Sequence, residues 1–184
     1  WVLSMDRKLT GLLSTLNLPC LRVLDLSEVE NQDLLRVKSS RSRREYCWTL
    51  TPFVFDFVFE RDTSAQRVTY VDADVFLRSD PASIFESLES SRKSVQITEH
   101  AYSADLDTSE EHGRFCVQFL TMNRIGSEAV RSDWKAKCLE WCFARVEPGK
   151  FGDQKYLDEW PTNFGNCVHI FPDREKFLGP WNAT

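Results

Sequence analysis

Hydrophobic positions along the chain follow two different periods. Leu9, Leu12, Leu13 and Leu16 recur at helical spacing on one face, whereas Val68 to Val71 is a short β-prone run bounded by polar residues. Segments of both kinds alternate from one end of the chain to the other, with no internal repeat and no low-complexity stretch. This alternation predicts one α/β domain over residues 1–184, with a mostly parallel central sheet flanked by helices.

The same patterns give approximate bounds for the elements. Strands are expected at 1–5, 21–26, 68–71, 94–98, 114–122 and 167–171. Helices are expected at 8–16, 31–37, 43–59, from 81 to about 88, 127–143 and 153–160. Pro52 should bend the long apolar helix because it lacks a backbone donor, and Pro161 should end the last one.

Two carboxylates follow the strand that we place at the centre of the sheet. Asp72 and Asp74 flank Ala73 directly after Val68 to Val71. Residues i and i+2 of an extended chain face the same side, so both carboxylates can point at one ligand. The carboxyl ends of strands in open α/β sheets border the ligand crevice, and hard oxygen donors suit a divalent cation that also holds phosphates. A solvated loop start with an Asx-turn at Asp74 is the alternative.

Two further segments carry candidate chemistry. Asp153 and Gln154 follow Gly152, and a short turn there could aim both side chains outward, with Asp153 as a base. Simple helix capping by Asp153 is the alternative, and local sequence favours it. Arg41 and Arg44 lie at the start of a predicted helix, where guanidinium groups could hold a pyrophosphate. A solvated basic turn is the alternative there.

Composition narrows the class of protein. The net charge is −5 and no long basic run occurs, which disfavours general nucleic-acid binding. No apolar run approaches the roughly 18 residues of a membrane span, so we expect no transmembrane segment and at most peripheral contact with a membrane. The six cysteines form no CxxC pair, and a reducing cytoplasm is the simplest setting.

Three stretches together resemble a known family. They read EYCWTLTP at 45–52, YVDADVFLRSDP at 70–81 and FGDQKYLDEWP at 151–161. In this order they resemble the bacterial nucleotide-diphospho-sugar transferases, which are glycosyltransferases of the GT-A fold, distantly similar to the glycogenin-like and lipopolysaccharide-galactosyltransferase families. The similarity covers nearly the whole chain.

The resemblance implies a function and a set of site residues. The protein would be a nucleotide-sugar-dependent glycosyltransferase, with hexosyl transfer expected, that moves a sugar from a donor such as a UDP-sugar to a hydroxyl of a glycan or other acceptor. Asp72, Ala73 and Asp74 would form the metal-binding motif for Mn²⁺ or Mg²⁺ and the diphosphate. Asp153 and Gln154 would lie near the transferred sugar, and Arg41 and Arg44 would border the phosphates.

The sequence also departs from that family. Cys116 and Gln118 stand where related enzymes often carry an Asn and a Gly, so the resemblance implies no sugar contacts from that strand. The first strand of such folds, which holds the nucleotide base, is expected before Trp1. The late His-containing segment that completes the metal site in many relatives is expected after Thr184.

Two other readings stay open. A phosphatase or phosphotransferase of the haloacid-dehalogenase type also places Asp-x-Asp after a hydrophobic strand, with the first Asp as covalent nucleophile. A non-catalytic domain that binds sugar nucleotides is the other alternative.

Overall fold

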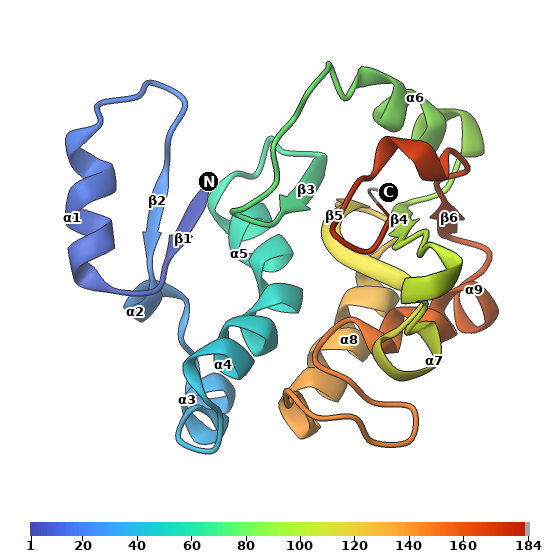
Figure 1. The fold of residues 1–184 in the computed structure, drawn as a ribbon. Helices are drawn as coiled ribbons and strands as arrows, with labels where there is room; N and C mark the ends of the chain where they lie inside the picture. Colours follow the sequence, from blue (N-terminus) through green and yellow to red (C-terminus); the bar gives the residue numbers. More distant parts are fainter. Residues whose placement is uncertain (183–184) are drawn as a thin grey trace.

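The chain folds as an α/β protein with two separate sheets (Figure 1). The computed structural model describes residues 1–182. The smaller sheet pairs two parallel strands, β1 (Val2–Ser4) and β2 (Val23–Asp25). The larger sheet has four strands in the order β3 (Arg67–Val71), β5 (Phe115–Asn123), β4 (Val95–Glu99) and β6 (Val168–Ile170). The α/β class predicted from the alternating pattern is therefore confirmed.

The larger sheet is mixed: β3, β4 and β6 run in one direction, in agreement with the prediction of a mostly parallel sheet, but β5 runs against them. β5 is antiparallel to both of its neighbours, β3 and β4, whereas β4 and β6 pair in parallel. A parallel crossover needs a long, usually helical, connection. The connection from β4 to β5 contains only a 3-10 turn (Ala104–Leu106) and the one-turn helix α7 (Ser109–His112), so the chain turns back beside β4.

The strand that carries the two carboxylates is also not central. β5 inserts between β3 and β4, which leaves β3 at the edge of the four-stranded sheet among the described residues. The sequence pattern could not show this, because the position of a strand depends on the direction of strands that come later in the chain.

One face of the larger sheet is covered by three helical segments. α5 (Val54–Arg61), α8 (Glu128–Glu140) and the adjoining 3-10 helix (Lys155–Glu159) with α9 (Trp160–Asn163) pack there. Their buried side chains include Phe55, Trp134 and Trp160, which contact the inward residues of β4 and β5. Pro161 lies inside α9 rather than ending a helix, because a proline in the first turn removes no helical hydrogen bond.

The opposite face of the sheet is covered by α6 (Ala82–Ser91) and by the segment after β6, which includes a 3-10 turn (Arg174–Lys176). Ile84, Phe119, Phe171 and Phe177 form the buried cluster there. Asp80 accepts a hydrogen bond from the backbone N of Ala82 at 2.9 Å, which supports the predicted start of this helix.

A second core joins the small sheet to the rest of the molecule. It lies between β2, α2 (Leu26–Val29) and α3 (Gln32–Lys38) on one side and α4 (Arg43–Leu50) with α5 on the other. The predicted long helix 43–59 is α4 and α5 joined by a 3-10 turn, Thr51–Phe53, with Pro52 at its start. In contrast, α1 (Arg7–Thr15) has no buried residue.

No helix within residues 1–182 combines the length and the apolar character that crossing a bilayer requires.

Candidate active site

The edge strand β3 brings Asp72 and Asp74 to the wall of one cavity. The backbone N of Asp72 donates to Gln118 O at 3.0 Å, so β5 holds the backbone one residue beyond β3. Val75 N then donates to Asp72 O at 3.1 Å, which turns the chain at Ala73 and leaves that residue exposed. Both carboxylates line a cavity of about 770 Å³, as the i, i+2 spacing predicts.

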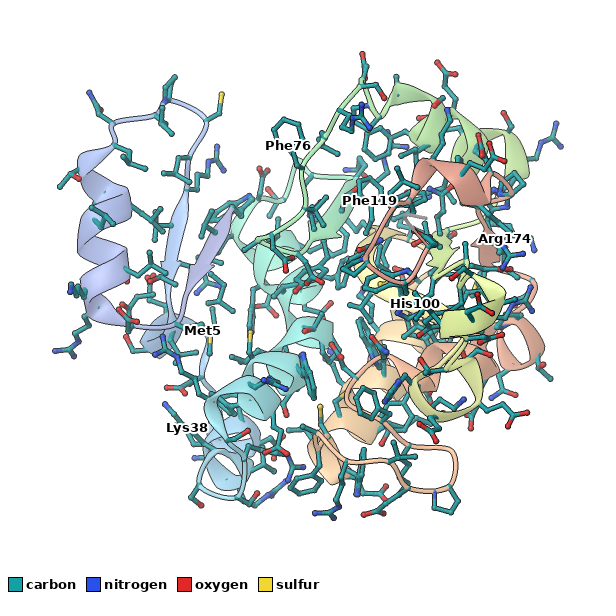
Figure 2. The ribbon with its side chains drawn as sticks, in the orientation of Figure 1. Met5, Lys38, Phe76, His100, Phe119 and Arg174 are labelled. Atoms are coloured by element: carbon teal, nitrogen blue, oxygen red, sulfur yellow. The ribbon has the colours of Figure 1, made fainter. Side chains whose placement is uncertain are left out.

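The other walls of this cavity come from segments far apart in the sequence. His100, Tyr102, Leu106, Thr108 and His112 come from the β4–β5 connection. Cys116 and Gln118 come from β5, Phe151 and Gln154 from the turn before the last helices, and Leu178 to Trp181 from the C-terminal segment. Figure 2 shows His100 in a crowded region of the molecule, whereas Phe76, 85% exposed, projects outward from the segment between β3 and α6.

The pKa of the Asp72 carboxyl is raised both by burial and by a neighbouring charge. Its half-buried position and, to a smaller extent, the neighbouring charge of Asp74 raise the pKa of the Asp72 carboxyl. The Tyr70 hydroxyl opposes this rise, because it donates a hydrogen bond to Asp72 Oδ1 at 2.6 Å. A cation beside the two carboxylates would remove the repulsion between them.

Asp153 is the most strongly perturbed carboxyl near the cavity. It is only 4% exposed, and this burial, together with the charge of Asp72, raises its pKa to about 7. The backbone around it is fixed, since Trp134 Nε1 donates to Asp153 O at 2.8 Å. Gly152 has a φ of +53°, and a Cβ there would lie 3.2 Å from the Trp48 ring.

Helix capping does not explain the position of Asp153. The following 3-10 helix has Gln154 at its N-cap and no side-chain capping bond. Two distant tryptophans, Trp48 and Trp134, contact the turn that carries Asp153, Trp48 beside Gly152 and Trp134 at the Asp153 carbonyl. No pattern in the local sequence signals this.

Gln154 lies in the cavity wall, on the side of the β4–β5 connection. Its Nε2 donates to His112 O at 2.7 Å, and Lys155 Nζ donates to Ser109 O at 2.9 Å. These two bonds tie the segment containing α7 to the turn that carries Asp153. The structure therefore brings Asp72, Asp74 and Gln154 to one cavity, with Asp153 close enough for its pKa to respond to the charge of Asp72.

An aromatic corner of the cavity was missed at the sequence level. The Trp181 and Tyr102 rings lie 5.0 and 4.8 Å from the His100 ring, between centroids. Trp181 Nε1 and Asn182 Nδ2 both donate to His100 O at 2.7 Å, and burial lowers the pKa of His100 to about 4. The sequence signal for this corner is the run Gly179 to Asn182, which is rich in residues that form turns.

The two predicted phosphate-binding arginines lie elsewhere. Arg41 donates to Leu139 O at 3.3 Å and its guanidinium lies 3.9 Å from the Phe143 ring centroid. Arg44 lies over the Trp48 ring at 5.9 Å. Neither residue lines the cavity that holds Asp72 and Asp74, so the structure does not bring these arginines together with the carboxylates.

The donor set fits a phosphate-bound Mn²⁺ or Mg²⁺. Within residues 1–182, no group of three or more His, Cys, Asp or Glu side chains forms a metal cage. Cations that bridge to phosphates are typically held by one or two carboxylates plus phosphate and water oxygens. Asp72 and Asp74 supply two hard oxygen donors in one cavity. The Cys116 thiol in the same wall has a pKa raised to about 12 by burial, so it offers no thiolate.

Comparison with known proteins gives relatives but no assigned activity. The chain is 32% identical over 189 aligned residues to the uncharacterized protein YfnF and 31% identical over 187 to the uncharacterized protein YfnD, both of Bacillus subtilis strain 168. Each alignment covers 99% of this chain but only 62% and 59% of the relative. The chain thus spans about three fifths of the length of these relatives. Neither a protein-family model nor a solved structure matches the chain.

Proposed function

We propose that the protein is a metal-dependent glycosyltransferase that uses a nucleotide-diphosphate sugar. The observation that carries the proposal is the shared cavity of Asp72 and Asp74 at the end of β3, with Gln154 in its wall and Asp153 buried beside it. In this function the two carboxylates hold Mn²⁺ or Mg²⁺ against the donor diphosphate. Such a cation neutralises the charge that develops on the leaving diphosphate.

Asp153 supplies the group that can hold or accept a proton. With a pKa of about 7, it is near the ideal for general acid–base chemistry at neutral pH. His100, with its pKa lowered to about 4, stays neutral and acts as a wall of the site together with Trp181. Gln154, held by its bond to His112 O, would contact the sugar in this function.

The finer fold assignment, GT-A, is part of the same proposal. It is supported by a strand that ends in Asp-x-Asp within a mixed sheet covered by helices on both faces. The outer edge of β3 pairs with no strand in the described part of the chain, and β1 lies on that side of it (Figure 1).

The proposed acceptor is a hydroxyl of a glycan or similar molecule, and the proposed setting is the cytoplasm. All six cysteines are free thiols, and Cys20 and Cys47 are exposed, which favours a reducing compartment.

Donor binding is the direct test. The full-length protein is mixed with Mn²⁺ and a panel of UDP- and GDP-sugars, and its thermal unfolding is followed. A donor present at a hundred times its dissociation constant should add about 2.7 kcal/mol to the stability. Turnover of that donor is then measured as release of nucleotide diphosphate, with and without acceptor.

Two variants make this test specific. Asp74→Ala should abolish both the Mn²⁺-dependent stabilisation and the turnover. Asp33→Ala removes an exposed carboxylate of α3 that pairs with Arg36 and should leave both unchanged. The proposal fails if no sugar nucleotide stabilises the protein, or if Asp74→Ala behaves like Asp33→Ala.

The same assays separate the alternatives. Stabilisation without any turnover would favour a non-catalytic binding domain. Trapping of a phospho-aspartate at Asp72 would favour a phosphatase or phosphotransferase of the haloacid-dehalogenase type.

A further inference from the structure

Tyr70 and Asp72 form a pair within β3 and the residues just after it. Their i, i+2 spacing puts both side chains on the same face of the strand. The Tyr70 ring packs against the main core cluster, and its backbone is paired with Leu120 of β5. Its hydroxyl therefore has a fixed position, from which it donates to Asp72 Oδ1 at 2.6 Å.

The two carboxylates of the motif are held very differently. Asp72 is fixed by its backbone bond to Gln118, by the turn from Val75, and by the Tyr70 hydroxyl. The exposed Asp74 side chain makes no hydrogen bond or ion pair that the geometry of residues 1–182 supports. One carboxylate is thus pre-positioned, and the other is free to adjust when a ligand arrives.

We propose that Tyr70 is a positioning residue for the cation: it occupies Oδ1 of Asp72 and so presents Oδ2 as a single, fixed oxygen ligand. This proposal rests on the proposed function, because it concerns the same metal site. Carboxylates that bind metals are themselves hydrogen-bonded, and loss of such a partner costs about 10–100-fold in metal affinity or activity. Tyr70 would supply this support from the core of the protein.

The chain contains a matched control for this hydrogen bond. Tyr46, 3% exposed in the second core, donates to Glu30 Oε1 at 2.7 Å. Tyr46→Phe and Tyr70→Phe therefore remove the same phenol–carboxylate bond from a packed ring, and only Tyr70→Phe does so beside Asp72.

The experiment measures Mn²⁺ binding to the full-length protein, alone and with UDP, from the paramagnetic resonance signal of free Mn²⁺. Tyr70→Phe should weaken binding about 10-fold, and Tyr46→Phe should leave it within about twofold of the wild type. Thermal unfolding without metal checks that both variants fold. In an Asp72→Asn background, Tyr70→Phe should have no further effect on Mn²⁺ binding, because the oxygen that it positions is no longer a ligand.

The outcomes separate the two proposals. If wild-type protein and Asp74→Ala bind Mn²⁺ equally, with and without UDP, the metal site itself is wrong and the proposed function falls. If the wild type binds Mn²⁺ through Asp74 but Tyr70→Phe binds it as tightly as Tyr46→Phe, only the role of Tyr70 is overturned. An effect of Tyr70→Phe that persists undiminished in Asp72→Asn also overturns it.

Discussion

The two hydrophobic cores differ in how firmly they fix the segments that pack on them. The core under the four-stranded sheet fully buries Phe55, Trp134 and Trp160, and the proposed site residues stand on this part of the molecule. The core beside the small sheet is smaller, and the helix α1 that accompanies it buries no side chain. The carboxylates therefore rest on the part of the fold with the most buried side chains, where small displacements are most strongly resisted.

The largest expected effect is the loss of the central tryptophan of the main core. Trp134→Ala removes a fully buried ring that packs edge-on against Trp160 at 5.3 Å between centroids. It should cost about 3–5 kcal/mol of unfolding free energy, measured by urea unfolding. Trp1→Ala, at a ring that is 41% exposed, is the control and should change stability by less than about 0.5 kcal/mol. If Trp134→Ala and Trp1→Ala lowered the free energy of unfolding equally, the main core would not be the firmer part of the molecule.

The next prediction concerns the free energy of unfolding that is lost because the Asp153 carboxyl is buried. Asp153 has a pKa of about 7 when folded and about 3.9 when unfolded. Between these values the folded protein binds more protons, so stability falls as pH rises from about 4 to about 7. Asp153→Asn removes this loss and should be more stable than the wild type by about 2–4 kcal/mol at pH 8. The gain should vanish near pH 4, as measured by urea unfolding across that range.

A carboxylate of the small sheet should respond with the opposite sign. Hydrogen bonds from the Ser27 side chain and backbone and from Thr10 lower the pKa of Asp25. Its contribution to stability is present above its unfolded pKa and is lost as pH falls through the folded pKa. Asp25→Asn should therefore destabilise at neutral pH and lose its effect in acid. If the effects of Asp153→Asn and Asp25→Asn on the free energy of unfolding changed with pH in the same direction, Asp153 would not be buried as described.

Truncation of a buried leucine tests the second core directly. Leu24→Ala truncates a residue of β2 that is 4% exposed and should cost about 2 kcal/mol, near the low end for buried leucines, because a small core can partly collapse around the cavity. Leu12→Ala on α1, at 62% exposure, should change stability by less than about 0.5 kcal/mol. A cost of 4 kcal/mol or more at Leu24 would remove the distinction between the two cores.

The sequence predicted elements better than their arrangement. The helix and strand types were set by local periodicity, and the run Val68 to Val71 with its two carboxylates was confirmed as a strand end at a cavity. The order and direction of the strands were not predictable, because the short connection from β4 to β5 has the polar composition of any loop. Its return beside β4 depends on contacts such as Gln154 with His112.

The sequence could predict which site residues lie together only where a single segment contains them. Asp72 and Asp74 are only two positions apart in the sequence, so strand geometry sufficed to place them together. The turn that carries Asp153 is contacted by the distant Trp48 and Trp134, and the aromatic corner joins His100 to Trp181 across 81 residues. Arg41 illustrates the reverse case, since its local setting suggested an anion site but its side chain packs on Phe143.

The open outer edge of β3 has a consequence for handling the protein. Unpaired backbone donors and acceptors along an edge strand are a template for pairing with another chain. Val71, 40% exposed, and the nearby Phe76, 85% exposed, add apolar surface on or near that edge. Preparations of the protein are therefore expected to self-associate through this edge at high concentration, and Lys in place of Val71 is the substitution that should keep them dispersed.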